Sequence, residues 1–206
     1  PSASPKTLPP SWLYDELGSI LFEAITALPE YGLTRADDAL LRSAARDIVA
    51  GAGQPGLILE LGSGSGSKTR HLLTASAEHS SVDYQPIDIS TSALETCRAA
   101  LSNLDRVRIK VIEAGYLDGL DHALARRAPK TRVMVLFLGC TIGNFEPSEA
   151  QNFLQDVRTR LRRGDTLLLG TDLVKPRNKV LKAYDDALGV TAAFNLNLLV
   201  RITREL

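Results

Sequence analysis

The chain has 206 residues, of which 44% are hydrophobic and 23% are charged. These proportions are typical of a folded globular protein, and they exclude disordered, collagen-like and coiled-coil chains. The 24 Lys and Arg residues balance 24 Asp and Glu residues. This balance argues against nucleic acid or a membrane surface as the main partner, because both favour a basic face. At about 100–200 residues per domain, the length predicts one domain with room for an insertion.

Cysteines and histidines do not suggest a metal site. Cys97 and Cys140 lie too far apart for a paired metal or redox motif, and the three histidines match no zinc spacing. The longest apolar run, 133–138, is far shorter than the ~20 residues that cross a bilayer. The first residues lack the apolar stretch of a signal peptide. We therefore expect a cytoplasmic protein without a bound metal.

The first 54 residues are predicted to form an extended arm followed by helices. Four prolines within residues 1–10 predict an extended arm. Residues 11–54 have helical apolar periodicity, and Pro29 is expected to end the first helix. Thr34 followed by Asp37 resembles a capping box that would begin the second helix.

Residues 55–175 alternate between short apolar runs and helical stretches, which predicts a parallel, doubly wound sheet of about five strands. Ser90 and Pro147 are expected to begin two of the helices between these strands. Residues 176–206 break the alternation. There we expect one helix, closed by Gly189, and a second one capped by Thr191. The five strands are expected at residues 57–61, 82–88, 107–112, 133–138 and 166–170.

A glycine-rich loop follows the first strand, at Gly62-Ser63-Gly64-Ser65-Gly66. Glycine lets the backbone turn sharply and approach a ligand, while the amides of the next helix attract negative charge. Three cofactor classes fit this loop to different degrees. A dinucleotide-binding loop requires a small residue at position 67, which Ser67 provides only approximately. A P-loop would end in Lys68-Thr69, but it requires glycine where Ser67 stands. Glu60, before the loop, is the acidic residue that precedes the glycine loop of S-adenosylmethionine (SAM) methyltransferases.

Asp88 narrows these alternatives. It ends the second strand, where a carboxylate can accept hydrogen bonds from both ribose hydroxyls of a ligand on the first loop. A P-loop protein has no use for an acid at this point, whereas dinucleotide-binding and SAM-binding folds both have one. The loop and Asp88 together therefore leave these two classes open.

Several ordered segments resemble one family: the histidine-specific SAM-dependent methyltransferases of ergothioneine biosynthesis, which trimethylate the α-amino group of L-histidine to give hercynine. The resemblance runs from about Trp12 to Leu206. It implies a Rossmann-like SAM-binding sheet with a helical N-terminal segment and, over 176–206, the start of a helical substrate lid. The segments that carry it are Tyr14–Ser19, Leu28–Tyr31, Glu60–Gly64, Lys68–Arg70, Phe137–Asn144, Gly170–Lys175, Ala183–Asp186 and Thr191–Asn197.

The resemblance also implies roles for individual residues. Asn144 would orient the amine and carboxylate of the amino-acid substrate, and Tyr14 or Tyr31 would accept or relay the proton of the amine. No strong general base is expected, because the neighbouring sulfonium favours the neutral amine. The SAM-binding positions would be Gly62, Gly64, Lys68, Asp88, Gly115 and Tyr116, and the substrate-binding positions Tyr31, Gly139, Asn144 and Tyr184.

Family members continue beyond the last helix of this chain and supply further strands of the sheet. We therefore expect the C-terminal strands to be missing and the strand at 166–170 to form an open edge, which soluble proteins tend to cover. Either the chain is a fragment of a longer one, or a partner or a second copy of the chain covers that edge by association. The alternative functions are N-methylation of another amino acid, such as a tryptophan derivative, and non-catalytic SAM binding. A dinucleotide oxidoreductase is disfavoured, because no later residue suggests a hydride-transfer site.

Overall fold

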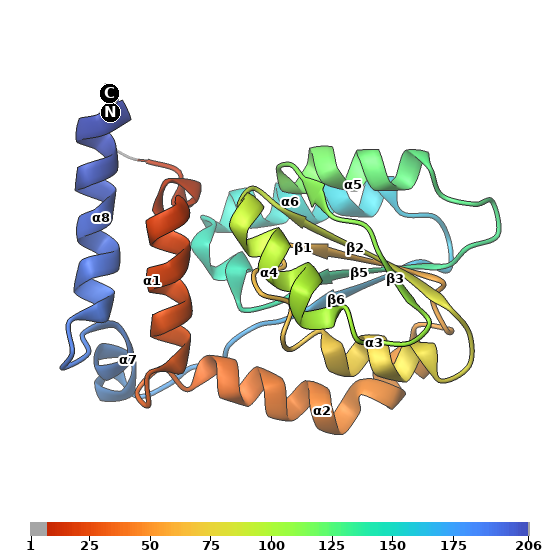
Figure 1. Ribbon diagram of the computed structural model, residues 1–206, viewed down its shortest axis with the longest axis horizontal. Coiled ribbons are helices and arrows are strands. Elements are labelled where there is room, and N and C mark those ends of the chain that lie inside the picture. Colours follow the sequence, from red (N-terminus) through yellow and green to blue (C-terminus); the bar gives the residue numbers. More distant parts are fainter. Residues whose placement is uncertain (1–7, 206) are drawn as a thin grey trace. The chain divides into compact units, whose positions relative to one another are not determined.

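A computed structural model describes residues 8–205 of the protein (Figure 1). Residues 1–7 of the expected extended arm lie outside this range, and Pro10 begins a short 3-10 helix, η1 (Pro10–Leu13), instead of continuing an arm. The chain forms two compact units. One combines the segment up to Thr34 with the segment from Leu173 onward, and the other comprises Arg35–Asp172.

The second unit contains the predicted parallel sheet. Its strands run in the order β3-β2-β1-β5-β6, and β4 also pairs with β2. All pairings are parallel. Each strand lies where the sequence predicts one, although there are six strands and not five. Their bounds are β1 (Leu57–Leu61), β2 (Val82–Asp88), β3 (Val107–Ile109), β4 (Ile112–Glu113), β5 (Val133–Phe137) and β6 (Thr166–Leu169).

The sixth strand arises because the segment predicted as one strand at 107–112 is divided into β3 and β4. Every second residue of β2 forms backbone hydrogen bonds with this segment. The Val82 N–H donates to the Arg106 carbonyl, and the Tyr84 carbonyl accepts from the Lys110 N–H. Pro86 follows in the same alternation and has no N–H to donate. The ladder is therefore interrupted at this point and resumes at Ile112.

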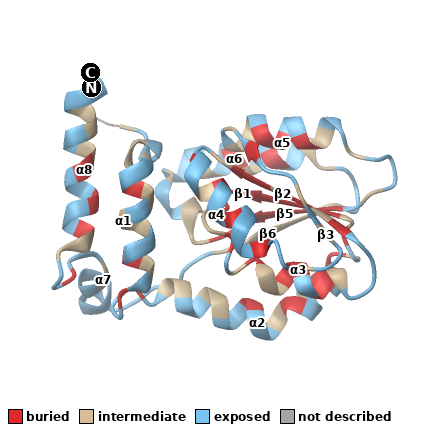
Figure 2. Ribbon diagram, in the orientation of Figure 1, coloured by how far each residue is buried: buried red, intermediate tan, exposed pale blue. Residues whose placement is uncertain are grey.

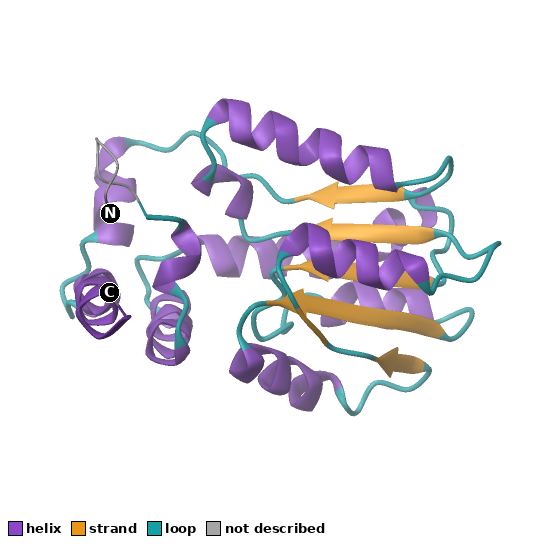
Figure 3. Ribbon diagram, turned by 90° about the horizontal axis from the view of Figure 1, so that it is seen from above, coloured by secondary structure: helices purple, strands orange, loops and turns teal. Residues whose placement is uncertain are grey.

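Helices cover both faces of the sheet in the second unit (Figure 3). On one face, Leu41, Leu72 and Leu101 pack against Ile58 and Leu136. On the other face, α5 and α6 place Leu120, Phe153 and Val157 against β1 and β5. Both β1 and β5 are buried along their whole lengths (Figure 2), as expected for central parallel strands. The helices are α2 (Leu33–Gly51), α3 (Arg70–Ala77), α4 (Thr91–Leu101), α5 (Tyr116–Ala125) and α6 (Pro147–Arg160).

Of three predicted helix starts, those at Ser90 and Pro147 are confirmed and the one at Thr34 is wrong. The Ser90 side chain accepts a hydrogen bond from the Ala93 N–H at 3.3 Å and so caps α4, and Pro147 is the first residue of α6. Thr34 does not cap α2, because that helix already begins at Leu33. Asp37 therefore does not take part in a capping box. Its carboxylate forms an ion pair with Lys68.

The first unit consists of η1, α1 (Glu16–Ala27), α7 (Arg177–Tyr184) and α8 (Val190–Glu205). Its core contains Ile25, Leu28, Tyr31 and Phe194. Asp15 links the N-terminal and C-terminal segments. Its Oδ1 accepts from the Gly18 N–H at 2.8 Å, which caps α1, and from Asn197 Nδ2 at 2.7 Å.

The predicted ends of the last two helices need correction. α7 ends at Tyr184, so neither Leu188 nor Gly189 belongs to it. Thr191 lies inside α8 and does not cap it. Instead, the Asp186 carboxylate accepts from the Val190 N–H at 2.9 Å and from the Thr191 N–H at 2.8 Å. These bonds satisfy the amides at the start of α8 better than the Thr191 hydroxyl could, because the acceptor is charged.

Removal of the Asp186 carboxylate is expected to fray the start of α8. The Thr191 and Val190 N–H groups lower the pKa of Asp186 to about 2. This stabilisation is therefore complete above about pH 4 and is lost as the pH falls toward 2. Amide hydrogen exchange at residues 190–194 should accelerate in Asp186→Ala, and in the wild-type chain near pH 2. The neighbouring Asp185→Ala is the matched control. Equal exchange rates in the two variants would contradict the cap.

Candidate functional site

The glycine loop between β1 and α3 has a backbone that favours glycine. Gly62, Gly64 and Gly66 have φ angles of 72°, 51° and 65°. At Gly66, a Cβ would also lie 2.5 Å from Cys97 Sγ, so a side chain does not fit. The Gly62 N–H donates to the Ile87 carbonyl at 2.8 Å, which ties the loop to the end of β2. This is the tight strand–loop–helix turn that the sequence predicts.

Asp88 lies directly against this loop. Its Oδ2 accepts from the Gly64 N–H at 3.1 Å, and its Oδ1 accepts from the Ser90 N–H at 3.0 Å. A carboxylate offers about four acceptor positions. Asp88 is only half-buried, so it can hold the loop and still accept hydrogen bonds from a diol. The structure thus brings together Gly62, Gly64 and Asp88.

Gly115 and Tyr116 begin α5, with Gly115 at the N-cap. The Tyr116 hydroxyl lies 3.3 Å from the place where a Cβ on Gly62 would stand. The Tyr116 ring packs edge-on against Phe137 and Phe153, with centroid distances of 5.4 and 5.9 Å. Tyr116 therefore borders the glycine loop, and its ring is held in place by the core.

Lys68 and Gly139, two further predicted site residues, lie close together in the same unit. Lys68 Nζ bonds Asp37 Oδ2 at 3.0 Å. It also lies 3.7 Å from the place where a Cβ on Gly139 would stand. Gly139 and Cys140 have φ angles of 71° and 59°, which turn the chain sharply after β5. Asn144 ends the following 3-10 helix, η2 (Thr141–Asn144), and is exposed.

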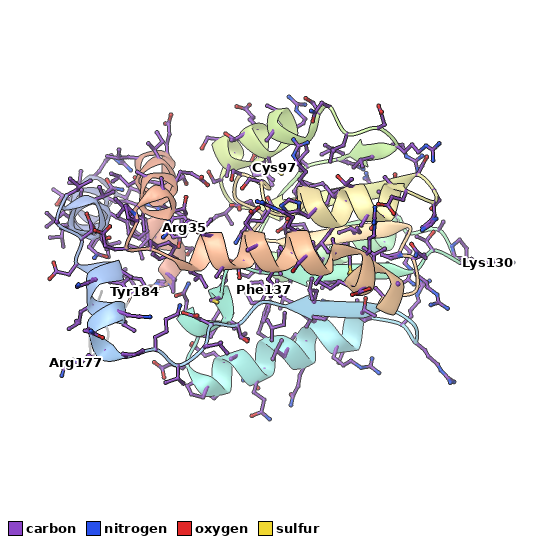
Figure 4. All side chains as sticks on the ribbon, turned by 90° about the horizontal axis from the view of Figure 1, so that it is seen from below. Arg35, Cys97, Lys130, Phe137, Arg177 and Tyr184 are labelled. Carbon is purple, nitrogen blue, oxygen red and sulfur yellow. The ribbon has the colours of Figure 1, made fainter. Side chains whose placement is uncertain are left out.

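The three tyrosines predicted to serve the substrate share an aromatic cluster in the first unit. Tyr14 packs edge-on against Phe22 and Phe194, at 5.4 and 5.7 Å between centroids. Tyr31 is buried and meets Tyr184 at 6.0 Å, at right angles. Tyr184, at the end of α7, is 58% exposed and can be reached from solvent (Figure 4).

Glu60, just before the loop, is the most perturbed carboxyl group of the second unit. It is 4% exposed, and its oxygens accept from the Thr69 hydroxyl at 2.8 Å and from the Tyr84 hydroxyl. Burial raises the pKa of Glu60 to about 7, against the lowering effect of these two donors and of nearby Lys68. Burial likewise raises the pKa of Cys97, which lies beside Tyr84, to about 11.

Sequence patterns could not identify the ion pair of Asp37 with Lys68 or the buried hydroxyl of Ser63. Asp37 looked like a helix-capping residue, and nothing in the sequence links it to Lys68, which is far along the chain. The Ser63 hydroxyl is buried in the glycine loop without a hydrogen-bond partner.

Within residues 8–205, no three acidic, histidine or cysteine side chains gather as a metal site would require. Over the same range, no helix is both long and apolar enough to span a bilayer.

The donor set fits a nucleoside cofactor. The loop holds an unpartnered polar atom at Ser63, and Asp88 retains acceptor capacity for a ribose. Comparison with known proteins decides the class of protein. The profile of a family described as "Histidine-specific methyltransferase, SAM-dependent" matches residues 2–206. The chain belongs to this family.

Two relatives of this chain differ in the substrate that their names give. The histidine N-alpha-methyltransferase of Mycolicibacterium smegmatis is 42% identical over 207 residues, which cover 100% of this chain and 63% of that protein. The 4-dimethylallyltryptophan N-methyltransferase of Claviceps purpurea is 31% identical, over 89% of this chain and 56% of that protein. The chain therefore spans less than two thirds of the length of these relatives.

The fold agrees with that of a solved structure. A DUF574 family protein from Streptomyces avermitilis superposes with a TM-score of 0.58 and 17% sequence identity, over 88% of this chain and 71% of that chain. At this identity, the likeness shows the fold alone. The predicted α/β, Rossmann-like parallel sheet is confirmed.

Proposed function

We propose that this chain takes part in SAM-dependent methylation of the α-amino group of L-histidine, toward hercynine. The observation that carries the proposal is the 42% identity to the mycobacterial histidine N-alpha-methyltransferase over the whole chain. The order of the glycine loop, Asp88 and Tyr116 supports it, because these groups can hold the nucleoside of the cofactor.

SAM, when bound, supplies a methyl group on an activated sulfonium. In the second unit, Asp88 would hold the ribose, Gly62 and Gly64 would admit the close approach of the cofactor, and Gly115 with Tyr116 would border the adenine. The Lys68 ammonium would attract the carboxylate of the cofactor. Lys68 already pairs with Asp37, so its position is set before any ligand binds.

The amine of the substrate must present its lone pair in line with the methyl group, so positioning accounts for most of the expected catalysis. Asn144 would orient the amine and carboxylate through its side-chain amide, beside the turn at Gly139. Tyr14 or Tyr31 would accept or relay the proton, and Tyr184 would contact the amino acid. A strong base is not required, because the cationic sulfonium lowers the pKa of a neighbouring amine.

Substitution of Asn144 by alanine tests the proposed substrate site. We expect turnover of L-histidine to fall about 100-fold, as for a misplaced reactant, while SAM binding stays unchanged. Labelled SAM and mass spectrometry of the amino-acid product measure this. The matched control is Asn152→Ala, an exposed asparagine on α6. Normal histidine turnover in Asn144→Ala would contradict the assigned role.

A second candidate substrate is a tryptophan derivative, because a tryptophan-modifying relative is 31% identical over most of the chain. A panel of amino acids with labelled SAM separates the two candidates. Methylation of histidine alone supports the first, and methylation of the tryptophan derivative alone supports the second. Binding of SAM without methylation of any amino acid would favour a non-catalytic role.

A further inference from the structure

The carboxyl group of Glu60 has no assigned role in the proposed function, and its surroundings are unusual. It lies at the end of β1, two residues before Gly62, and is almost fully buried. Its carboxylate oxygens accept hydrogen bonds from two neutral hydroxyls, those of Thr69 at the start of α3 and of Tyr84 on β2. Within residues 8–205, no cationic side chain forms an ion pair with it.

The charged groups near Glu60 do not neutralise it. Lys68 in the loop acts on Glu60 through its charge, but it pairs with Asp37 of α2 at 3.0 Å. Asp88, at the end of β2, adds a second negative charge that disfavours ionised Glu60. On the α4 side, Cys97 contacts Tyr84 at 3.7 Å and is protonated near neutral pH, since its pKa is raised to about 11. The charged groups that act on the buried carboxyl are therefore one cation, Lys68, which is shared with Asp37, and one other carboxylate, Asp88.

An isolated buried carboxyl group tends to hold its proton, because burial disfavours the charged form. The pKa of Glu60 is accordingly raised to about 7 by burial. A positive charge brought to the adjacent loop would favour the ionised form. The proposed cofactor has such a charge in its sulfonium, and the demethylated product, a neutral thioether, lacks it.

We propose that Glu60 is the electrostatic counter-group of the sulfonium, losing its proton to the solvent when SAM binds and regaining it when the thioether product forms. This inference rests on the proposed function. The carboxyl O–H bond breaks, the buffer takes up the proton, and no bond forms between Glu60 and the cofactor. Glu60 is thus a positioning and charge-discriminating residue that favours substrate cofactor over product.

The pH dependence follows from the direction of the proton transfer. In the free chain Glu60 titrates near pH 7, and with SAM bound it titrates at lower pH. SAM affinity should therefore weaken as the pH falls from 8 to 6, by up to about tenfold, because protonated Glu60 must first ionise. The affinity for the thioether S-adenosylhomocysteine should change much less, since that ligand lacks the sulfonium but has the same amino group.

Isothermal titration calorimetry of the 206-residue chain tests this with SAM and S-adenosylhomocysteine between pH 5.5 and 8.5. Buffers of different ionisation enthalpy give the number of protons released, and we expect a net release near neutral pH with SAM but not with the thioether. Glu60→Gln should abolish this release and flatten the SAM profile to that of the thioether. Glu113→Gln, an exposed glutamate on β4, is the matched control and should behave as wild type.

Tyr84→Phe keeps the test informative if Glu60→Gln does not fold, as judged by circular dichroism. It removes one donor to the Glu60 carboxylate and keeps the ring, so the midpoint of the SAM profile should move to higher pH. A purely structural role of Glu60 predicts the same loss of affinity at every pH. Identical pH profiles for SAM and the thioether in the wild-type chain would overturn the inference alone. Failure to bind either ligand at any pH would overturn the proposed function as well.

Discussion

The Asp88→Ala variant is expected to bind SAM at least about 100-fold more weakly than the wild-type chain. Two hydrogen bonds from ribose hydroxyls to a carboxylate contribute about 3 kcal/mol or more together, and each 1.4 kcal/mol is about tenfold in Kd. The loss should be larger still because Asp88 also accepts from the Gly64 N–H and thereby shapes the loop. Calorimetry with SAM measures the change in Kd.

Two controls separate cofactor binding from folding. Asp83→Ala removes a carboxylate from the same strand, where it pairs with Arg108 at 2.6 Å, and should leave Kd unchanged. Asp88→Asn retains one acceptor and should fall between wild type and Asp88→Ala. Titration with NAD and ATP beside SAM tests the cofactor class. Unchanged SAM binding in Asp88→Ala would contradict the assignment, and preferential NAD binding would favour a dinucleotide site.

The Asp165→Ala variant is expected to lower the free energy of unfolding by about 3–5 kcal/mol, since it leaves a buried guanidinium without its partner. Asp165 and Arg127 are 1% and 5% exposed and are joined by two hydrogen bonds, at 2.6 and 2.8 Å. Asp165 also accepts from the backbone N–H groups of Arg162 and Val133. The pair therefore ties the start of β5 to the turn before β6.

Urea unfolding of single and double variants measures the contribution of the Arg127–Asp165 pair to the free energy of unfolding. Arg127→Met should lower the free energy of unfolding by a comparable amount. The double variant should lose less free energy of unfolding than the two single variants together. The control is the more exposed Arg160–Asp121 pair, whose removal should cost below about 1 kcal/mol. A loss as small in Asp165→Ala as in Asp121→Ala would contradict the argument.

The same pair predicts a pH dependence of stability. Burial alone would raise the pKa of Asp165, but Arg127 and the N–H groups of Arg162 and Val133 outweigh burial and lower it. Because the folded pKa lies below the ordinary value of about 3.9, the stabilisation is complete above about pH 4. It decreases as the pH falls through the folded pKa. Asp165→Asn should remove this part of the acid sensitivity.

Local sequence patterns predicted the parts of the fold that depend on neighbouring residues. The strands at 57–61 and 82–88 lie where predicted, because short apolar runs between turns leave few alternatives. The Ser90 cap and the positive φ angles of the glycine loop follow from local backbone chemistry as well. The family resemblance, carried by ordered motifs, agrees with the family match over residues 2–206.

Other features depend on residues that are distant in the sequence. Pro86 divides a neighbouring strand because it cannot donate across the ladder, and this effect requires the strand pairing. Asp186 caps α8 in place of Thr191 because its carboxylate reaches two amides after the chain turns. Asp37 pairs with Lys68 only because α2 packs against the sheet beside the loop.

The sequence by itself therefore determined the fold class, the glycine-rich turn after the first strand and the family, since each is carried by short-range patterns. Only the tertiary structure decided the raised pKa of Glu60, the partner of Lys68 and the burial of Arg127 with Asp165. The physical reason is that electrostatic energies depend on burial and on through-space distance. The same glutamate before a glycine loop would be an ordinary anion in water, but beneath this loop it titrates near neutral pH.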